Sequence, residues 1–155
     1  MFKFLIIIMF VSIPVFASEE CKVVKGFNLC DDAITIANNT KADIGLIRKN
    51  SEYVLKSVYA KNMVVISAYE SIYTKDEIIK IIQTSLINRK INGSTINEKF
   101  RKVKDDATKR LCEFYKNDVF VKDGGSFKVS YSFKNGDIFH TVLAEKNNCR
   151  EIEHS

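Results

Sequence analysis

Few residues in this sequence are suited to acid–base or nucleophilic chemistry. Only two histidines occur among its 155 residues, His140 and His154. A general base must lie within hydrogen-bond reach of the proton it removes, and histidine serves most often. His140 belongs to a strand-like pattern that places it beside Tyr131, whereas His154 is second to last, where chains usually fray. We therefore expect His140 to be a hydrogen-bonded residue of the core or its rim rather than a catalytic base.

The familiar catalytic and cofactor motifs do not occur. The sequence has no G-x-S-x-G elbow, no H-E-x-x-H pair and no Walker loop. Gly124-Gly125 could cradle a phosphate, but Ser126 opens a strand-like stretch and not the helix that such a site needs. We therefore expect a protein without a cofactor and lean towards a non-enzymatic role. The alternative is a small secreted basic hydrolase, similar to a nuclease, that uses His140.

The first 17 residues have the pattern of a secretory signal peptide. Lys3 supplies a positive charge, residues 4–15 are almost all apolar, and Ala17 precedes a polar stretch. The apolar run is shorter than the roughly 20 residues of a membrane span, so an uncleaved anchor is less favoured. We predict a signal peptide over residues 1–17 and one exported domain over residues 18–155, with no transmembrane segment. Its Lys-, Asn- and Ile-rich composition favours a bacterial periplasm, and secretion from the cell is the alternative.

Four cysteines lie beyond this leader: Cys21, Cys30, Cys112 and Cys149. They form no C-x-x-C pair and have no histidine nearby, so neither a metal site nor a dithiol redox site is predicted. An even number of cysteines in an exported chain indicates disulfides. We predict the pairs Cys21–Cys30 and Cys112–Cys149, because the first two share the N-terminal segment and the last two flank the C-terminal half.

Composition and charge narrow the classes of partner. The chain is 46% hydrophobic and 28% charged, which is typical of a folded domain rather than a disordered chain. Its net charge of +5 comes from lysines scattered along the sequence, so no specific nucleic-acid partner is predicted. A membrane-surface role would need a one-sided basic helix face, and Asp105 and Asp106 interrupt that face.

Two β-hairpins are predicted. Residues 53–73 are rich in Val, Ile, Tyr and Ser, with a turn at Lys61-Asn62. Residues 126–145 alternate around Asn135-Gly136, the strongest signal for a two-residue type I′ turn. Pairing Phe133 with Ile138 defines one core face, which joins Tyr131 to His140, Val129 to Val142 and Phe127 to Ala144.

Helices are predicted between and before the hairpins. Thr74–Glu77 and Thr95–Glu98 have the form of capping boxes, and the apolar residues after each follow a helical period. Asp31-Asp32 precedes a short apolar run and predicts a short N-terminal helix. The fold class is therefore α+β, an antiparallel sheet from two hairpins with two amphipathic helices on one face, stabilised by disulfides.

Phe139 and Leu143 are apolar residues on the otherwise polar reverse face of the second hairpin. Exposed apolar residues on a polar face can mark a contact surface, so these two form a candidate partner-contact patch, and burial under the N-terminal segment is the alternative. We predict a non-enzymatic protein-binding or accessory factor whose partner is another protein of the cell envelope. An immunity or inhibitor protein and an accessory factor of a secretion or conjugation system belong to this class.

Overall fold

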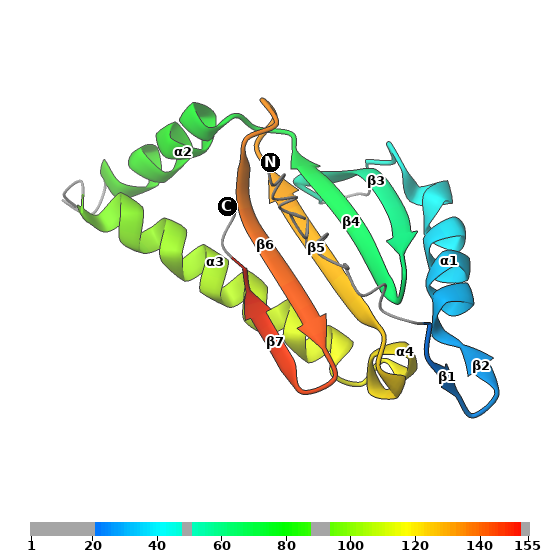
Figure 1. Cartoon of the computed structure of the whole chain (residues 1–155). Coiled ribbons are helices and arrows are strands. Elements are labelled where there is room, and N and C mark those ends of the chain that lie inside the picture. The colour runs from blue at the N-terminus through cyan, green and yellow to red at the C-terminus, as the bar shows by residue number, and fades with distance from the viewer. Residues whose placement is uncertain (1–20, 48–50, 88–93, 153–155) are drawn as a thin grey trace, which may run out of the picture.

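The computed structural model of the chain describes residues 21–47, 51–87 and 94–152. The predicted leader lies outside these ranges, as does Asn92-Gly93, a turn signal that predicts the end of the helix after Thr74. One five-stranded sheet organises the fold (Figure 1). Its strands follow the order β3 (Tyr53–Lys61), β4 (Val64–Ser71), β5 (Ser126–Ser132), β6 (Ile138–Glu145) and β7 (Asn148–Glu151).

The α+β class is confirmed, and both predicted hairpins form antiparallel pairs, β3 with β4 and β5 with β6. The two hairpins join through a parallel pairing of β4 with β5, so the sheet is mixed rather than wholly antiparallel. Between these strands the chain passes through α2 (Lys75–Ile87), α3 (Ser94–Tyr115) and α4 (Val119–Asp123). A long crossover is what a parallel pair needs, and the 22 residues of α3 span about 33 Å, enough to return the chain to the sheet's other end.

The N-terminal helix is confirmed as α1 (Leu29–Thr40), which follows a small hairpin of β1 (Val23–Val24) and β2 (Phe27–Asn28) and leads into a 3₁₀ turn, η1 (Lys41–Asp43). Asn28 caps α1, because its side-chain oxygen accepts a hydrogen bond from the Cys30 N–H at 2.9 Å. Asp31 and Asp32 lie inside the first turn rather than ahead of it. They still complement the positive end of the helix.

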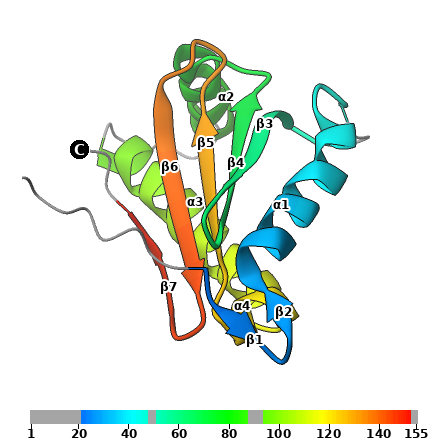
Figure 2. The same cartoon turned by 45° about the vertical axis from the view of Figure 1, so that its right-hand side comes forward.

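Two helices share one face of the sheet. Helix α1 packs over β3 and β4, and α3 packs over β6 and β7 (Figure 2). Helix α2 lies beyond the end of the sheet and contacts α3, so α1 takes the place on the sheet that we expected for α2 (Figure 1). The main core lies under α1 and α4 and consists of Leu29, Ala33, Ala37, Leu55, Val58, Val65, Phe120, Val121, Phe127 and Ala144.

Both predicted disulfides are confirmed. Cys21–Cys30 closes the β1–β2 hairpin onto the start of α1, and Cys112–Cys149 joins α3 to β7, a strand that the sequence pattern did not predict. Disulfides persist in oxidising compartments, so the pair indicates an exported protein. Within the ranges given above, no helix combines the length and the apolar character that a membrane span requires.

The second hairpin departs from its predicted register at one end. The pairs of Tyr131 with His140, Val129 with Val142 and Phe127 with Ala144 are confirmed, but Ile138 pairs with Ser132 and not with Phe133. Only Gly136 of the predicted turn has positive φ, at 87°, whereas a type I′ turn needs positive φ at both central residues. The Phe133 N–H donates to the Asp137 carbonyl at 2.9 Å and closes a turn of residues 134–136, and one extra residue, Phe139, is left in β6 as a β-bulge.

Candidate functional site

The bulge places Phe139 on the helix-covered face of the sheet, among aromatic rings from the neighbouring strands. The ring centres of Tyr53 and Tyr131 lie 5.1 Å apart, and Phe139 lies 6.4 Å from Tyr53 and 6.2 Å from Tyr131. Tyr69 stacks on Tyr131 at 5.6 Å. This aromatic row therefore takes one ring from each of the adjacent strands β3, β4, β5 and β6, which hold the rings in fixed positions.

A cavity of about 390 Å³ opens between this row and α3. Helices α1 and α3 approach each other near α4 and diverge towards the opposite end of the sheet (Figures 1 and 2). The cavity, called the aromatic groove below, is lined by Tyr53, Tyr131, Phe139 and His140 from the sheet side, by Val103, Asp106, Ala107 and Arg110 from α3, and by Glu52. Val103 is 51% exposed although apolar, so this side of α3 offers free apolar surface to a partner.

The tyrosines of the groove keep their hydroxyl protons. Burial raises the pKa of Tyr131 to about 12, and burial together with the nearby charge of Glu52 raises the pKa of Tyr53. Among the described residues, neither hydroxyl has a hydrogen-bond partner. Both are therefore neutral donors at physiological pH, ready to bind carbonyl groups of a ligand.

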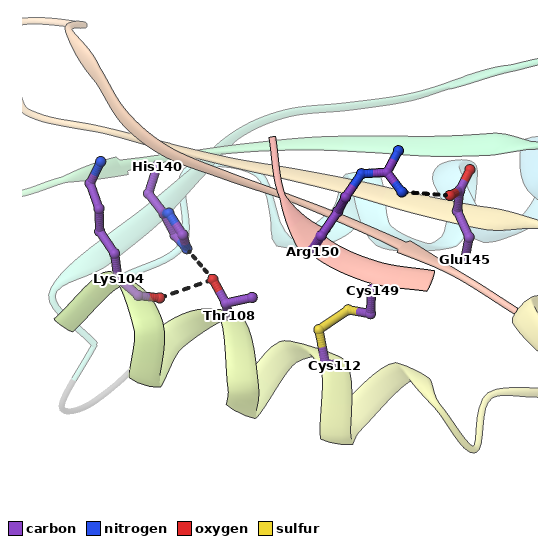
Figure 3. Close-up of a disulfide and its surroundings, with 7 residues drawn as sticks. All are labelled: Lys104, Thr108, Cys112, His140, Glu145, Cys149 and Arg150. Atoms are coloured by element: carbon purple, nitrogen blue, oxygen red, sulfur yellow. Dashed lines mark hydrogen bonds and ion pairs between the residues drawn. A yellow bond between two sulfur atoms is a disulfide. The ribbon is translucent and has the colours of Figure 1, made fainter. Parts of the chain in front are cut away.

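His140 lies at the edge of the groove, but its ring is fully buried and both ring nitrogens face other protein groups. Its Nε2 lies 3.1 Å from the Thr108 hydroxyl oxygen, a contact drawn as a dashed line in Figure 3. That hydroxyl donates its one proton to the Lys104 carbonyl at 3.0 Å, so the proton between Thr108 and His140 belongs to Nε2. On the other side, Nδ1 lies 3.1 Å from a Glu151 carboxylate oxygen, without the alignment of a good hydrogen bond.

These contacts bear on the chemistry of His140. A general base needs a ring nitrogen without a proton that faces the substrate, whereas here Nε2 donates to Thr108 and Nδ1 faces a carboxylate. Tyr131 stacks beside the imidazole at 6.3 Å between ring centres rather than hydrogen-bonding to it. The side chain of His140 thus connects β6 to both α3 and β7, close to the Cys112–Cys149 disulfide (Figure 3).

Glu151 predicts an acid-dependent loss of stability. Its partial burial opposes ionisation, but the contact with the His140 ring at 3.1 Å and the charge of Lys104 at 3.4 Å hold its pKa below the ordinary value. A carboxyl whose pKa is lower in the folded chain stabilises the fold above its unfolded pKa, and this contribution disappears as pH falls through the folded pKa. We expect Glu151→Gln to lower the melting temperature at pH 7. Below about pH 4.5, where the carboxyl of the wild type takes up a proton, the melting temperature of the variant should fall less steeply than that of the wild type.

The measurement is thermal unfolding by circular dichroism across that pH range. Glu145→Gln is the matched control. Glu145 lies at the end of β6, before the turn to β7, and pairs at 3.7 Å with the exposed Arg150. A pH profile of Glu151→Gln that parallels the wild type would contradict the assigned contact with His140.

The structure separates the two residues of the predicted contact patch. Phe139 faces α3, whereas Leu143 lies on the opposite face of the sheet, beside Val64, Ile66 and Lys128. Tyr131 and His140 do come together, as their register predicted. Sequence reasoning missed Tyr53 and the role of Val103, since nothing local indicates that a strand residue and a helix residue line the same cavity. No cluster of three or more metal-ligating side chains occurs among the residues described.

Comparisons with known proteins find likeness only at the level of structure. No family model matches the chain, and no curated protein matches it. A pilotin of the type 2 secretion system of Vibrio vulnificus, EpsS, is 10% identical with a TM-score of 0.49, covering 77% of this chain and 89% of its own. The type II secretion system pilotin AspS of Vibrio cholerae is 14% identical with a TM-score of 0.47, covering 77% and 90%. Likeness of this degree assigns the chain to no family.

Proposed function

We propose that this protein is a non-enzymatic accessory factor of the cell envelope, periplasmic in location, that binds another protein through the aromatic groove. The observation that supports this best is the open row of aromatic rings beside α3. Protein interfaces are enriched in Tyr and Phe at their centres, with polar groups around them. The groove has this composition, because its aromatic and aliphatic floor is bordered by Glu52, Asp106 and Arg110.

The shape of the groove favours one mode of binding. Its volume of about 390 Å³ lies between a helix and a sheet, which suits the apolar face of a partner helix or a few anchoring side chains. The neutral hydroxyls of Tyr53 and Tyr131 would then bind polar atoms of the partner backbone. Phe139 is the proposed contact at the floor of the groove. Leu143 lies on the other face of the sheet, so any contact that it makes with a partner would be at a different surface.

We also propose that the protein is exported and that its role belongs to one of the two classes predicted from the sequence. Two disulfides and the expected leader support a periplasmic protein, with secretion as the alternative. Both an immunity or inhibitor protein and a secretion accessory would use such a groove. A hydrolase acting through His140 is not favoured by the geometry, because protein groups occupy both ring nitrogens.

The test is affinity capture from envelope extracts of the native host with the mature, oxidised protein. Val103→Glu puts a charge into the groove, and burying an unpaired charge in an interface costs several kcal/mol, so we expect capture to fall at least about 100-fold. Ile81→Glu is the matched control, because Ile81 is 52% exposed on α2 and does not line the groove, whereas Val103 is 51% exposed. Equal capture by both variants would refute the proposed site.

A further inference from the structure

A second cavity, of about 550 Å³, lies on the other side of α3. Helix α3, Lys75 of α2 and the tip of the β5–β6 hairpin border it. Its floor is apolar, with Phe100 edge-on to Phe133 at 6.5 Å and Phe133 against Phe139 at 4.9 Å between ring centres. Ile138 lines the same cavity and is 52% exposed. An apolar floor is therefore accessible here as well as in the aromatic groove.

The charges around this cavity, called the basic hollow below, are not balanced. Its charged lining residues are Lys75, Arg101, Lys104, Asp137 and Glu151. Lys104 is paired with Glu151 at 3.4 Å, which leaves the cations Lys75 and Arg101 against the single carboxylate of Asp137, which keeps its charge while it accepts a hydrogen bond from Asn135 at 2.8 Å. Among the described residues, no ion pair involves Lys75 or Arg101.

The aromatic groove has the opposite balance. Two carboxylates, Glu52 and Asp106, face a single cation there, Arg110. Opposite charge on the two sides of one helix selects ligands by sign, because like charges brought together across an interface cost several kcal/mol. The basic hollow is thus the part of this surface suited to an anionic ligand.

We propose that the basic hollow binds an acidic segment of a partner protein, in which carboxylates flank an aromatic or aliphatic side chain. The apolar side chain would pack on Phe100, Phe133 and Ile138. Arg101 offers the planar fork that binds a carboxylate through two hydrogen bonds, and Lys75 supplies a second cation across the cavity. The inference rests on the proposed function as a binding factor, but it uses residues that the aromatic groove does not.

The test uses two short fluorescein-labelled helical peptides with the same stripe of Leu and Phe. Glu fills the other positions in one peptide and Lys in the other. Titrated by fluorescence anisotropy against the full oxidised chain, the Glu peptide should bind at least about tenfold more tightly, and added salt should weaken it. Arg101→Glu combined with Lys75→Glu should reverse the preference.

Lys102→Glu is the matched control, since it makes the same reversal of charge at an exposed position of the same helix that lines neither cavity. It should leave the affinity for the Glu peptide within about twofold. Equal binding of both peptides, or equal weakening by Arg101→Glu and Lys102→Glu, overturns the inference. The proposed function fails separately, because it depends on the loss of host-partner capture in Val103→Glu and not on these peptides.

Discussion

Replacing Cys112 and Cys149 with serine is expected to lower the free energy of unfolding by about 4 kcal/mol. The two cysteines are 37 residues apart in sequence, and freeing so long a loop increases the entropy of the unfolded chain by roughly this amount. The loss is a large part of the about 5 to 15 kcal/mol that stabilise a domain. Because the bridge joins α3 to β7, its removal also loosens the helix that forms one wall of both cavities.

Denaturant unfolding of the oxidised proteins measures this effect. The matched control replaces Cys21 and Cys30, which are nine residues apart and close a shorter loop worth about 2.7 kcal/mol. The Cys112 and Cys149 variant should be the less stable of the two and should bind the host partner more weakly. A smaller loss of stability than in the control would show that the bridge is not what holds α3 to the sheet.

His140→Ala is expected to cost about 3 kcal/mol of folding stability. The side chain is fully buried, so truncation leaves a cavity under α3 and removes the contacts to Thr108 and Glu151. Capture of the host partner should fall in parallel, since the ring also supports Tyr131 and Phe139. Chemical denaturation and affinity capture check the two effects.

A second variant separates this structural role from catalysis. His140→Gln keeps a polar side chain that can donate to Thr108, so it should recover part of the stability that alanine loses. Screens for nuclease and hydrolase activity on both variants complete the comparison. A stable His140→Ala protein that loses an activity present in the wild type would falsify the structural role and favour the hydrolase alternative.

Local sequence signals predicted the elements whose causes are local. Alternation of side chains predicted the pairing around Val129 and Val142. The capping box predicted the start of α2, where Glu77 accepts the Thr74 N–H at 2.7 Å and the Thr74 hydroxyl accepts the Glu77 N–H at 3.3 Å. Disulfide pairing followed from the separation of the cysteines in the chain.

Other features depend on effects that no local pattern encodes. Strand β7 spans only Asn148–Glu151 and α4 only Val119–Asp123, so neither is long enough to show a period. The β-bulge at Phe139 follows from the turn, where Gly136 alone takes the left-handed conformation. That single shift moved Phe139 from the predicted reverse face into the groove and separated it from Leu143.

The candidate site was predictable only in part for the same reason. Register alone brought Tyr131 beside His140. The opposite wall comes from α3, whose position depends on the parallel crossover and on the Cys112–Cys149 bridge. Val103 follows the apolar period of its helix, which predicts burial, and only the packed structure shows that half of its surface stays exposed at the groove.

Photo-crosslinking in the native host tests the proposed groove most directly. A photoreactive phenylalanine analogue replaces Val103 in one strain and Ile81 in another, two apolar positions of almost equal exposure, 51% and 52%. We expect one discrete crosslinked envelope protein at position 103 and none at position 81. An adduct at position 81 without one at position 103 would contradict it, because the partner would then dock on α2 and not in the groove.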